Sequence, residues 1–368
     1  MKKLVYLIIM SVLLTLVPVD SAEAATKAVA TPVVTSVYDK KLDDFKYKFT
    51  HSNKNAKIYY RGVDTKKWKR AKNGQTLKLG YFERQDGIYV YAQVGKTKSK
   101  VRYCNPWTLD ERAAEAKAKK DLSKIISKDD NKDMKFMKLL VFFKKNYDYS
   151  FSYYANNTLD TRKTKTVFRR KGECGALADV FTLYCKVLGI KAETVTDRDV
   201  DYKYRYDHAW NHVYLDKYPI LVDPTSFCYG GDCSYIYDYY ELDYNTYLKS
   251  KYQFTKTKAA ACECIFQGKL RRGGLVFEEL VWGETSDVRF EHNKVTFHFY
   301  DTSFVDCGCE PEDLTVSLTY YPSTGYWYEK VVDNATGEIT RDDKAEVDAW
   351  YAAHPEVERV YGKNAVRK

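Results

Sequence analysis

The chain has 368 residues, 45% of them apolar and 30% charged, which excludes a disordered tail and allows two or three globular domains. Its net charge of +10 is spread along the chain, and no nucleic-acid-binding motif accompanies it. Diffuse positive charge attracts anionic cell-wall polymers, membrane headgroups or acidic substrates at long range, and simple solubility explains it equally well.

Residues 1–24 have the features of a secretory signal peptide. Two lysines precede an apolar run from Leu4 to Val17, and Ala22-Glu23-Ala24 offers a small-x-small cleavage site. The run is shorter than the ~20 residues of a comfortable membrane span. We therefore expect a secreted or extracellular protein that has no transmembrane span after cleavage. Association with the cell surface is an alternative that the sequence leaves open.

Residues 32–104 are expected to form a β-sandwich-like accessory domain of immunoglobulin or fibronectin type. Short segments rich in β-forming residues, such as Phe45–Phe49, Ile58–Val63 and Gly87–Val94, are separated by turns. The 34 tyrosines of the chain fit half-buried strands and wet binding surfaces. Domains of this kind usually act as spacers between other domains or bind ligands, and they seldom carry a catalytic site.

The helical part of the sequence comes next, at the start of a predicted core domain over residues 108–260. Thr108 and Glu111 have the spacing of a capping box, which predicts a helix from Thr108 to about Ser127. Apolar periodicity predicts a second helix from Asp133 to Lys145.

Residues 265–368 are expected to form a separate, mostly β C-terminal domain. Strands are predicted at Leu275–Trp282, Lys294–Tyr300, Leu314–Tyr321 and Tyr326–Val332, and a terminal helix from Asp342 to Ala352. The predicted fold class is thus α+β, with a core between two mostly β accessory domains.

A cysteine stands where a helix begins in the middle of this core. The segment from Gly172 to Ile190 carries one apolar helical stripe, and Gly189 is placed to end the helix. Cys174 therefore lies at the first turn, where unpaired N–H groups and partial positive charge stabilise a thiolate. The same N–H groups are candidates to hold an oxyanion, and Glu173 is interpreted as a surface residue.

A histidine and an aspartate follow on a predicted hairpin. Asp207–Leu215 and Ile220–Thr225 have the pattern of two antiparallel strands joined by a tight loop. This folding returns Asp223 to the start of the first strand, beside His208. An acidic partner fixes the tautomer of a histidine and stabilises its imidazolium, which is the arrangement that acyl transfer by a cysteine needs.

The three segments GECGALADVFTLYCKVLGI, DHAWNHVYL and LVDPT resemble the motif blocks of the transglutaminase-like superfamily, over about residues 130–260. The resemblance implies a papain-like core with Cys174 as nucleophile, His208 as base and Asp223 as the orienting acid. It also implies a thioester intermediate, which water hydrolyses or an amine captures, and it calls for no cofactor and no metal.

Each of these residues has a second interpretation. Cys174 could be a disulfide partner, His212 competes with His208, and Asp223 could cap a turn before Pro224. Trp210 and Tyr214 are interpreted as packing residues. A second oxyanion donor is open among Tyr149, Tyr153, Tyr154 and a backbone amide.

The nine cysteines leave at least one thiol unpaired within a monomer. Cys228 and Cys233 bracket a glycine turn and could bridge each other. The pairs Cys262/Cys264 and Cys307/Cys309 could cross-pair as disulfides, which export favours, or form a four-thiolate zinc site. Cys185 is interpreted as a buried core residue.

The sequence therefore predicts an exported cysteine acyl-transfer enzyme that acts on amide bonds of proteins or cell-wall peptides. Hydrolysis is favoured slightly over transamidation, because water is the default acceptor. The alternative is an inactive transglutaminase-like protein that binds a surface, or an adhesion protein in which the tyrosine-rich β domains matter most.

Overall fold

A computed structural model describes residues 28–150, 162–196, 208–215, 220–228, 280, 285–301, 310–322 and 326–353. Its contacts divide the chain into two compact units. One comprises Met1–Thr35 and Lys46–Trp107, and the other comprises Ser36–Phe45 and Thr108–Lys368. Among the described helices, none has the length and hydropathy that crossing a bilayer requires. The predicted signal segment 1–24 lies outside the described residues.

The first unit is built from two sheets. Its elements are β1 (Val33–Asp39), β2 (Asp44–Thr50), β3 (Lys57–Gly62), β4 (Lys69–Ala71), β5 (Thr76–Leu77), α2 (Tyr81–Gln85), β6 (Ile88–Val94), β7 (Thr97–Lys98) and β8 (Arg102–Cys104). One sheet has the order β1-β2-β5, and the other has the order β4-β3-β6-β7 with β8 also paired to β6. The rings of Phe49 and Tyr60, one from each sheet, lie 5.1 Å apart, and alternate residues of both sheets are buried. The three strands predicted in this region are confirmed.

Most of α3 (Pro106–Leu122) belongs to the second unit, and this helix starts earlier than the sequence suggested. The capping box prediction is wrong, because Thr108 lies inside the helix. Asn105 takes that place, accepting a hydrogen bond from the backbone N–H of Trp107 at 2.9 Å. Pro106 follows at the first helical position, where its fixed φ and missing N–H cost nothing.

Among the described residues, four further helices, a two-stranded sheet and a three-stranded sheet complete the core that contains Cys174. The elements are α4 (Lys132–Asn146), β9 (Asp148–Tyr149), α5 (Arg162–Arg169), β10 (Lys171–Gly172), α6 (Cys174–Val187), β11 (Lys191–Thr196), β12 (Ala209–Tyr214), β13 (Ile220–Val222) and α7 (Pro224–Cys228). Strands β11, β12 and β13 are antiparallel neighbours, as the predicted hairpin requires. The helix α6 begins at Cys174 and stops before Gly189, whose φ is +72°.

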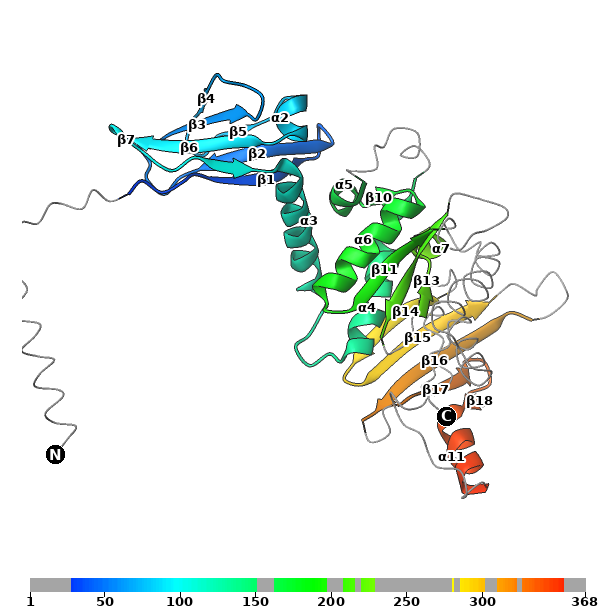
Figure 1. Ribbon diagram of the computed structural model, residues 1–368. Helices are drawn as coiled ribbons and strands as arrows, with labels where there is room; N and C mark the ends of the chain where they lie inside the picture. Colours follow the sequence, from blue (N-terminus) through cyan, green and yellow to red (C-terminus); the bar gives the residue numbers. More distant parts are fainter. Residues whose placement is uncertain are drawn as a thin grey trace, which may run out of the picture. The chain divides into compact units, whose positions relative to one another are not determined.

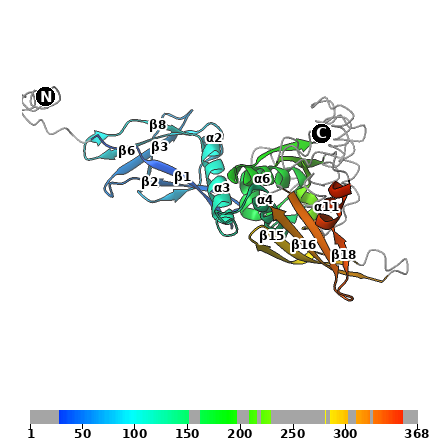
Figure 2. The ribbon, with the colours of Figure 1, turned by 90° about the horizontal axis from the view of Figure 1, so that it is seen from below.

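The C-terminal sheet has five strands in sequence order (Figures 1 and 2). Its elements are β14 (Thr285–Glu291), β15 (Lys294–Asp301), β16 (Glu312–Tyr321), β17 (Tyr326–Asp333), β18 (Ile339–Asp342) and the helix α11 (Asp343–Ala353). Three predicted strands and the terminal helix are confirmed, whereas β14 and β18 were missed. Of the strand predicted at Leu275–Trp282, only Leu280 is described.

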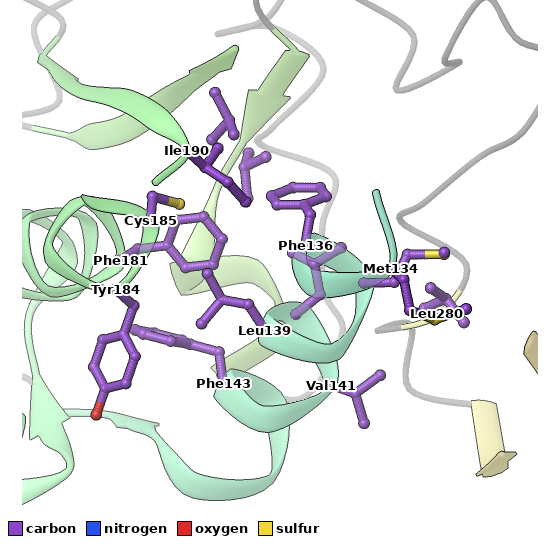
Figure 3. Packing of buried hydrophobic residues seen from close by; sticks show 14 of the residues in the cluster. Met134, Phe136, Leu139, Val141, Phe143, Phe181, Tyr184, Cys185, Ile190 and Leu280 are labelled. Atoms are coloured by element: carbon purple, nitrogen blue, oxygen red, sulfur yellow. The ribbon is translucent and has the colours of Figure 1, made fainter. Parts of the chain in front are cut away.

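The helix α4 packs against α6 and also against the C-terminal sheet. The ring centroids of Phe143 and of Phe181 on α6 lie 5.2 Å apart, while Met134 lies beside Leu280 (Figure 3). Trp327 of β17 donates a hydrogen bond from Nε1 to Asp133 at 3.1 Å. The C-terminal sheet thus shares a hydrophobic core with α4 and α6, and the domain boundaries proposed from sequence stay a prediction.

A buried ion pair fixes the turn that leads into α6. Arg170 has a φ of +66°, a conformation usually left to glycine at a helix end. Its guanidinium pairs with Asp121 and donates to the hydroxyls of Tyr147 at 2.6 Å and Tyr184 at 2.9 Å. Burial alone would raise the pKa of Asp121, but hydrogen bonds from Lys117 and Tyr184 and the Arg170 charge hold it below its ordinary value.

We expect Asp121→Asn to lower the free energy of unfolding by about 3 kcal/mol, since it leaves a partly buried guanidinium without its counter-ion. The matched control on the same helix is Glu115→Gln. That carboxylate pairs with Lys119 at the surface, so its loss should cost less than about 1 kcal/mol. Urea unfolding of both variants measures the difference, and equal costs would contradict this role of Asp121.

Candidate active site

The three residues predicted from the sequence are contributed by three separate elements. Cys174 is the first residue of α6, His208 lies one residue before β12, and Asp223 lies between β13 and α7. Cys174 is 5% exposed and Asp223 is 3% exposed. Nε2 of His208 is 2.6 Å from Oδ2 of Asp223. The structure therefore brings the predicted histidine and aspartate into direct contact.

Cys174 completes the arrangement on the other side of the imidazole. Burial alone would lower the pKa of His208, but the charge and hydrogen bond of Asp223 and the smaller contribution of Cys174 outweigh it. Together they raise the pKa of His208 from 6.5 to about 10. Because Nε2 is bound to Asp223, the nitrogen that remains for the thiol is Nδ1. The imidazole of His208 therefore interacts with both the carboxylate of Asp223 and the side chain of Cys174.

Asp223 makes the contacts that both of its interpretations require. Oδ2 bonds His208, while Oδ1 accepts the backbone N–H of Thr225 at 2.8 Å. Its backbone carbonyl accepts the hydroxyl of Ser226 at 2.7 Å. The carboxylate is thus held by the first turn of α7, which fixes the direction in which it meets the imidazole.

The neighbouring histidine, His212, contacts a different carboxylate. His212 is fully buried, and its Nδ1 lies 3.3 Å from Oε1 of Glu193 on β11. Tyr214 donates to the same oxygen at 2.6 Å. Trp210 is buried and stacks near His208, with ring centroids 6.1 Å apart and planes inclined by 28°. Of the two candidate histidines, it is therefore His208 that contacts Asp223.

Glu173 is the site residue that sequence reasoning missed. It is 2% exposed, so its interpretation as a surface residue is wrong. Its carboxylate caps α6, accepting the backbone N–H of Gly175 at 2.7 Å and of Ala176 at 3.1 Å. Cys174 Sγ lies 3.7 Å from Glu173 Oε2. An acidic residue directly before a predicted helix start was the signal, because a carboxylate is stabilised by the partial positive charge at a helix N-terminus.

The cap changes the expected oxyanion site. The N–H groups of Gly175 and Ala176, which the sequence suggested as oxyanion donors, are occupied by the Glu173 carboxylate. Of the proposed second donors, Tyr149 is half-buried on β9, whereas Tyr153 and Tyr154 lie outside the described residues. The donor set stays open.

The remaining cysteines differ in what can be described. Cys185 is buried on α6, and burial raises the pKa of its thiol well above the ordinary value. Burial, Asp223 and Asp148 do the same for Cys228. Cys185 and Cys228 are free thiols. Cys233 and the cysteines of both Cys-x-Cys pairs lie outside the described residues, as does any disulfide or zinc site that they form.

Comparison with known families follows this geometry. The model of the transglutaminase-like superfamily matches residues 120–224, which include Cys174, His208 and Asp223. This segment of the chain is transglutaminase-like. The match supports a cysteine peptidase or acyltransferase in general terms.

Other comparisons add little to the transglutaminase-like assignment. A solved protein from Cytophaga hutchinsonii, described as a candidate cysteine protease, aligns over 54% of this chain and 73% of its own, with 12% identity and a TM-score of 0.24. A TM-score this low does not establish a shared fold. No curated protein matches the chain.

Two substitutions at Glu173 separate its cap from its charge. Glu173→Ala should lower the free energy of unfolding by about 1 kcal/mol, because it removes the N-cap. Glu173→Gln keeps an acceptor oxygen and removes a negative charge near Cys174, so it should speed alkylation of this thiol several-fold near pH 6.5. Urea unfolding and timed labelling measure the two effects. Slower labelling of Glu173→Gln would show that the charge does not oppose the thiolate.

The histidine should remain protonated far above its ordinary range. Because its folded pKa is raised, the pair with Asp223 contributes stability in full below pH 6.5, and this contribution is lost as the pH rises through about 10. Ring-proton NMR of histidine-labelled protein should show this midpoint, with His208→Ala providing the assignment. Asp223→Asn should move the midpoint down, and an unchanged midpoint would contradict the ion pair.

Proposed function

We propose that the protein is an exported cysteine enzyme that transfers acyl groups from amide bonds of proteins or cell-wall peptides. The observation that carries this proposal is the contact of His208 with both Asp223 and Cys174, at the start of a capped helix. The transglutaminase-like match over the same residues supports it. The export signal, the substrate class and the bias toward water come from sequence alone.

The proposed reaction has two halves. The Cys174 thiolate attacks the amide carbonyl carbon, a C–S bond forms, and the C–N bond breaks as Nδ1 of the His208 imidazolium gives its proton to the leaving amine. Water then attacks the thioester while neutral His208 takes its proton. The C–S bond then breaks with the Cys174 thiolate as the leaving group, and a carboxylic acid is released.

Asp223 acts on the histidine rather than on the substrate. Its hydrogen bond at Nε2 keeps Nδ1 directed toward the sulfur and stabilises the imidazolium. A primary amine in place of water would give transamidation by the same steps. We favour hydrolysis, because water needs no dedicated site. No metal or organic cofactor enters these steps.

The proposal predicts one unusually reactive thiol. Iodoacetamide near pH 6.5, in the presence of reductant and followed by peptide mass spectrometry, should label Cys174 well before Cys185 or Cys228. Both of the latter have thiols whose pKa is raised by burial, so they are internal controls. Substituting His208→Ala should slow labelling of Cys174 at least tenfold, or about 1.4 kcal/mol.

The acceptor is decided by a second measurement on the same protein. A glutamine-containing peptide incubated with and without a primary amine should lose ammonia in both cases, and the acid product should predominate. A product that forms only with the amine would replace hydrolysis by cross-linking. If Cys174 labels no faster than Cys185 with reductant, or is mapped to a disulfide without reductant, the enzyme proposal fails and the surface-binding alternative takes its place.

A further inference from the structure

One face of the first unit has an unusual composition. On the β4-β3-β6-β7 sheet with β8, alternate residues point into the sandwich and are apolar, such as Ile58, Val90 and Ala92. The opposite face is defined by residues that pair across the strands. These are Lys57, Tyr59, Arg61, Arg70, Tyr89, Tyr91, Gln93, Lys98 and Tyr103. No carboxylate occupies any of these strand positions, and we name this surface the tyrosine–cation face.

The rings of this face are engaged with one another and with cations. Tyr59 and Tyr91 are stacked, with centroids 4.9 Å apart and planes inclined by 13°. The Arg61 guanidinium lies 4.8 Å from the centroid of Tyr89 and 5.3 Å from that of Trp68. Several ring faces are therefore covered. Gln93 Nε2 donates to the carbonyl of Gly95 at 3.0 Å, and the Tyr103 hydroxyl donates to that of Asp86 at 3.1 Å. The hydroxyl oxygens of these tyrosines and the Gln93 amide oxygen are groups that can accept hydrogen bonds from a ligand.

Three cations on this face are exposed. Lys57, Arg70 and Lys98 stand on three different strands, and no ion pair joins any of them to a carboxylate in the described part of the chain. Elsewhere in the protein, cations such as Lys138 do have acidic partners. Arg61 is different, because its Nη1 donates to the carbonyls of Val63 and Thr65.

The spacing of these cations indicates the size of the partner. Arg70 on β4 and Lys98 on β7 are separated by three strand spacings, roughly 14 Å. One small anion cannot reach both. A chain with repeated negative charges that lies across the strands can contact all three cations at once.

The aromatic rings whose faces are covered further limit the class of polyanion that can bind. Single-stranded nucleic acid is recognised by bases that stack on open ring faces, and several of these faces are taken. A sugar chain instead offers many hydroxyl donors, which match the tyrosine hydroxyl oxygens and the Gln93 amide oxygen of this surface. We propose that the tyrosine–cation face binds a linear, carboxylate-bearing polysaccharide. This binding does not depend on the chemistry at Cys174.

The experiment uses the mature full-length chain with Cys174→Ala, so that turnover cannot complicate binding. The probes are polygalacturonate, uncharged dextran, oligothymidylate and polyglutamate, with affinity measured at several salt concentrations. Polygalacturonate should bind best, and its affinity should fall between about 50 and 200 mM salt as charge attraction is screened. Dextran should not bind.

Matched variants locate the site. Together, Lys57→Gln, Arg70→Gln and Lys98→Gln should weaken polygalacturonate binding by about tenfold, because three charge contacts are lost from one surface. The control removes the same charge from exposed residues off this face, through Lys48→Gln, Lys54→Gln and Lys72→Gln. It should weaken binding less than about twofold.

Unfolding midpoints should match among the three proteins, because all six side chains are exposed. Absent binding of polygalacturonate would overturn the proposal, as would equal loss in both triple variants. Equal or tighter binding of oligothymidylate, polyglutamate or dextran would overturn the assignment to a carboxylate-bearing polysaccharide.

Discussion

The packing of α6 on β12 is the contact on which the rest of the site depends. Cys174 begins the helix and His208 precedes the strand, so only this packing brings the two together. Asn211, which is fully buried, secures it by donating from Nδ2 to the carbonyl of Ala178 and to the hydroxyl of Thr182, each at 2.9 Å. Val213 adds apolar burial to this core. A buried amide of this kind specifies one alignment of helix and strand, because other alignments would leave it unpaired.

The approach of the chain to Cys174 is constrained as tightly as the helix itself. Arg170 adopts a left-handed conformation, and its backbone carbonyl accepts the N–H of Asp148 at 2.9 Å. Gly172 follows, and a Cβ there would lie 3.0 Å from Thr166 and 3.1 Å from Ala176. The short parallel pair β9–β10 and this close approach deliver Glu173 and Cys174 to the helix start in one geometry.

The charges around the sulfur oppose one another. Glu173 disfavours a second negative charge at the helix start, whereas the His208 imidazolium favours it. Asp223 stands behind the imidazole and keeps it protonated, with a pKa raised to about 10. His208 therefore holds the proton that the proposed reaction gives to a leaving amine at neutral pH, while the Glu173 carboxylate lies 3.7 Å from Cys174 Sγ.

Local patterns were enough to predict the helix that begins at Cys174, the hairpin that carries His208 and Asp223, and most strands of the C-terminal sheet. They could not show the links between distant parts of the chain. The bond from Trp327 to Asp133 and the pair of Arg170 with Asp121 join residues that no periodicity connects. Glu173 was misjudged for a different reason, because glutamate side chains are mostly exposed and only the packed helix start shows the burial of this one.

The measurement that tests the central claim most directly is capture of the acyl-enzyme. The mature protein is mixed with an activated acyl ester, quenched in acid, and examined by intact and peptide mass spectrometry. The account predicts one acyl group on Cys174 that hydroxylamine removes, as a thioester requires, and much less of it in His208→Ala. An unmodified protein, or an adduct on another residue, would contradict Cys174 as the nucleophile.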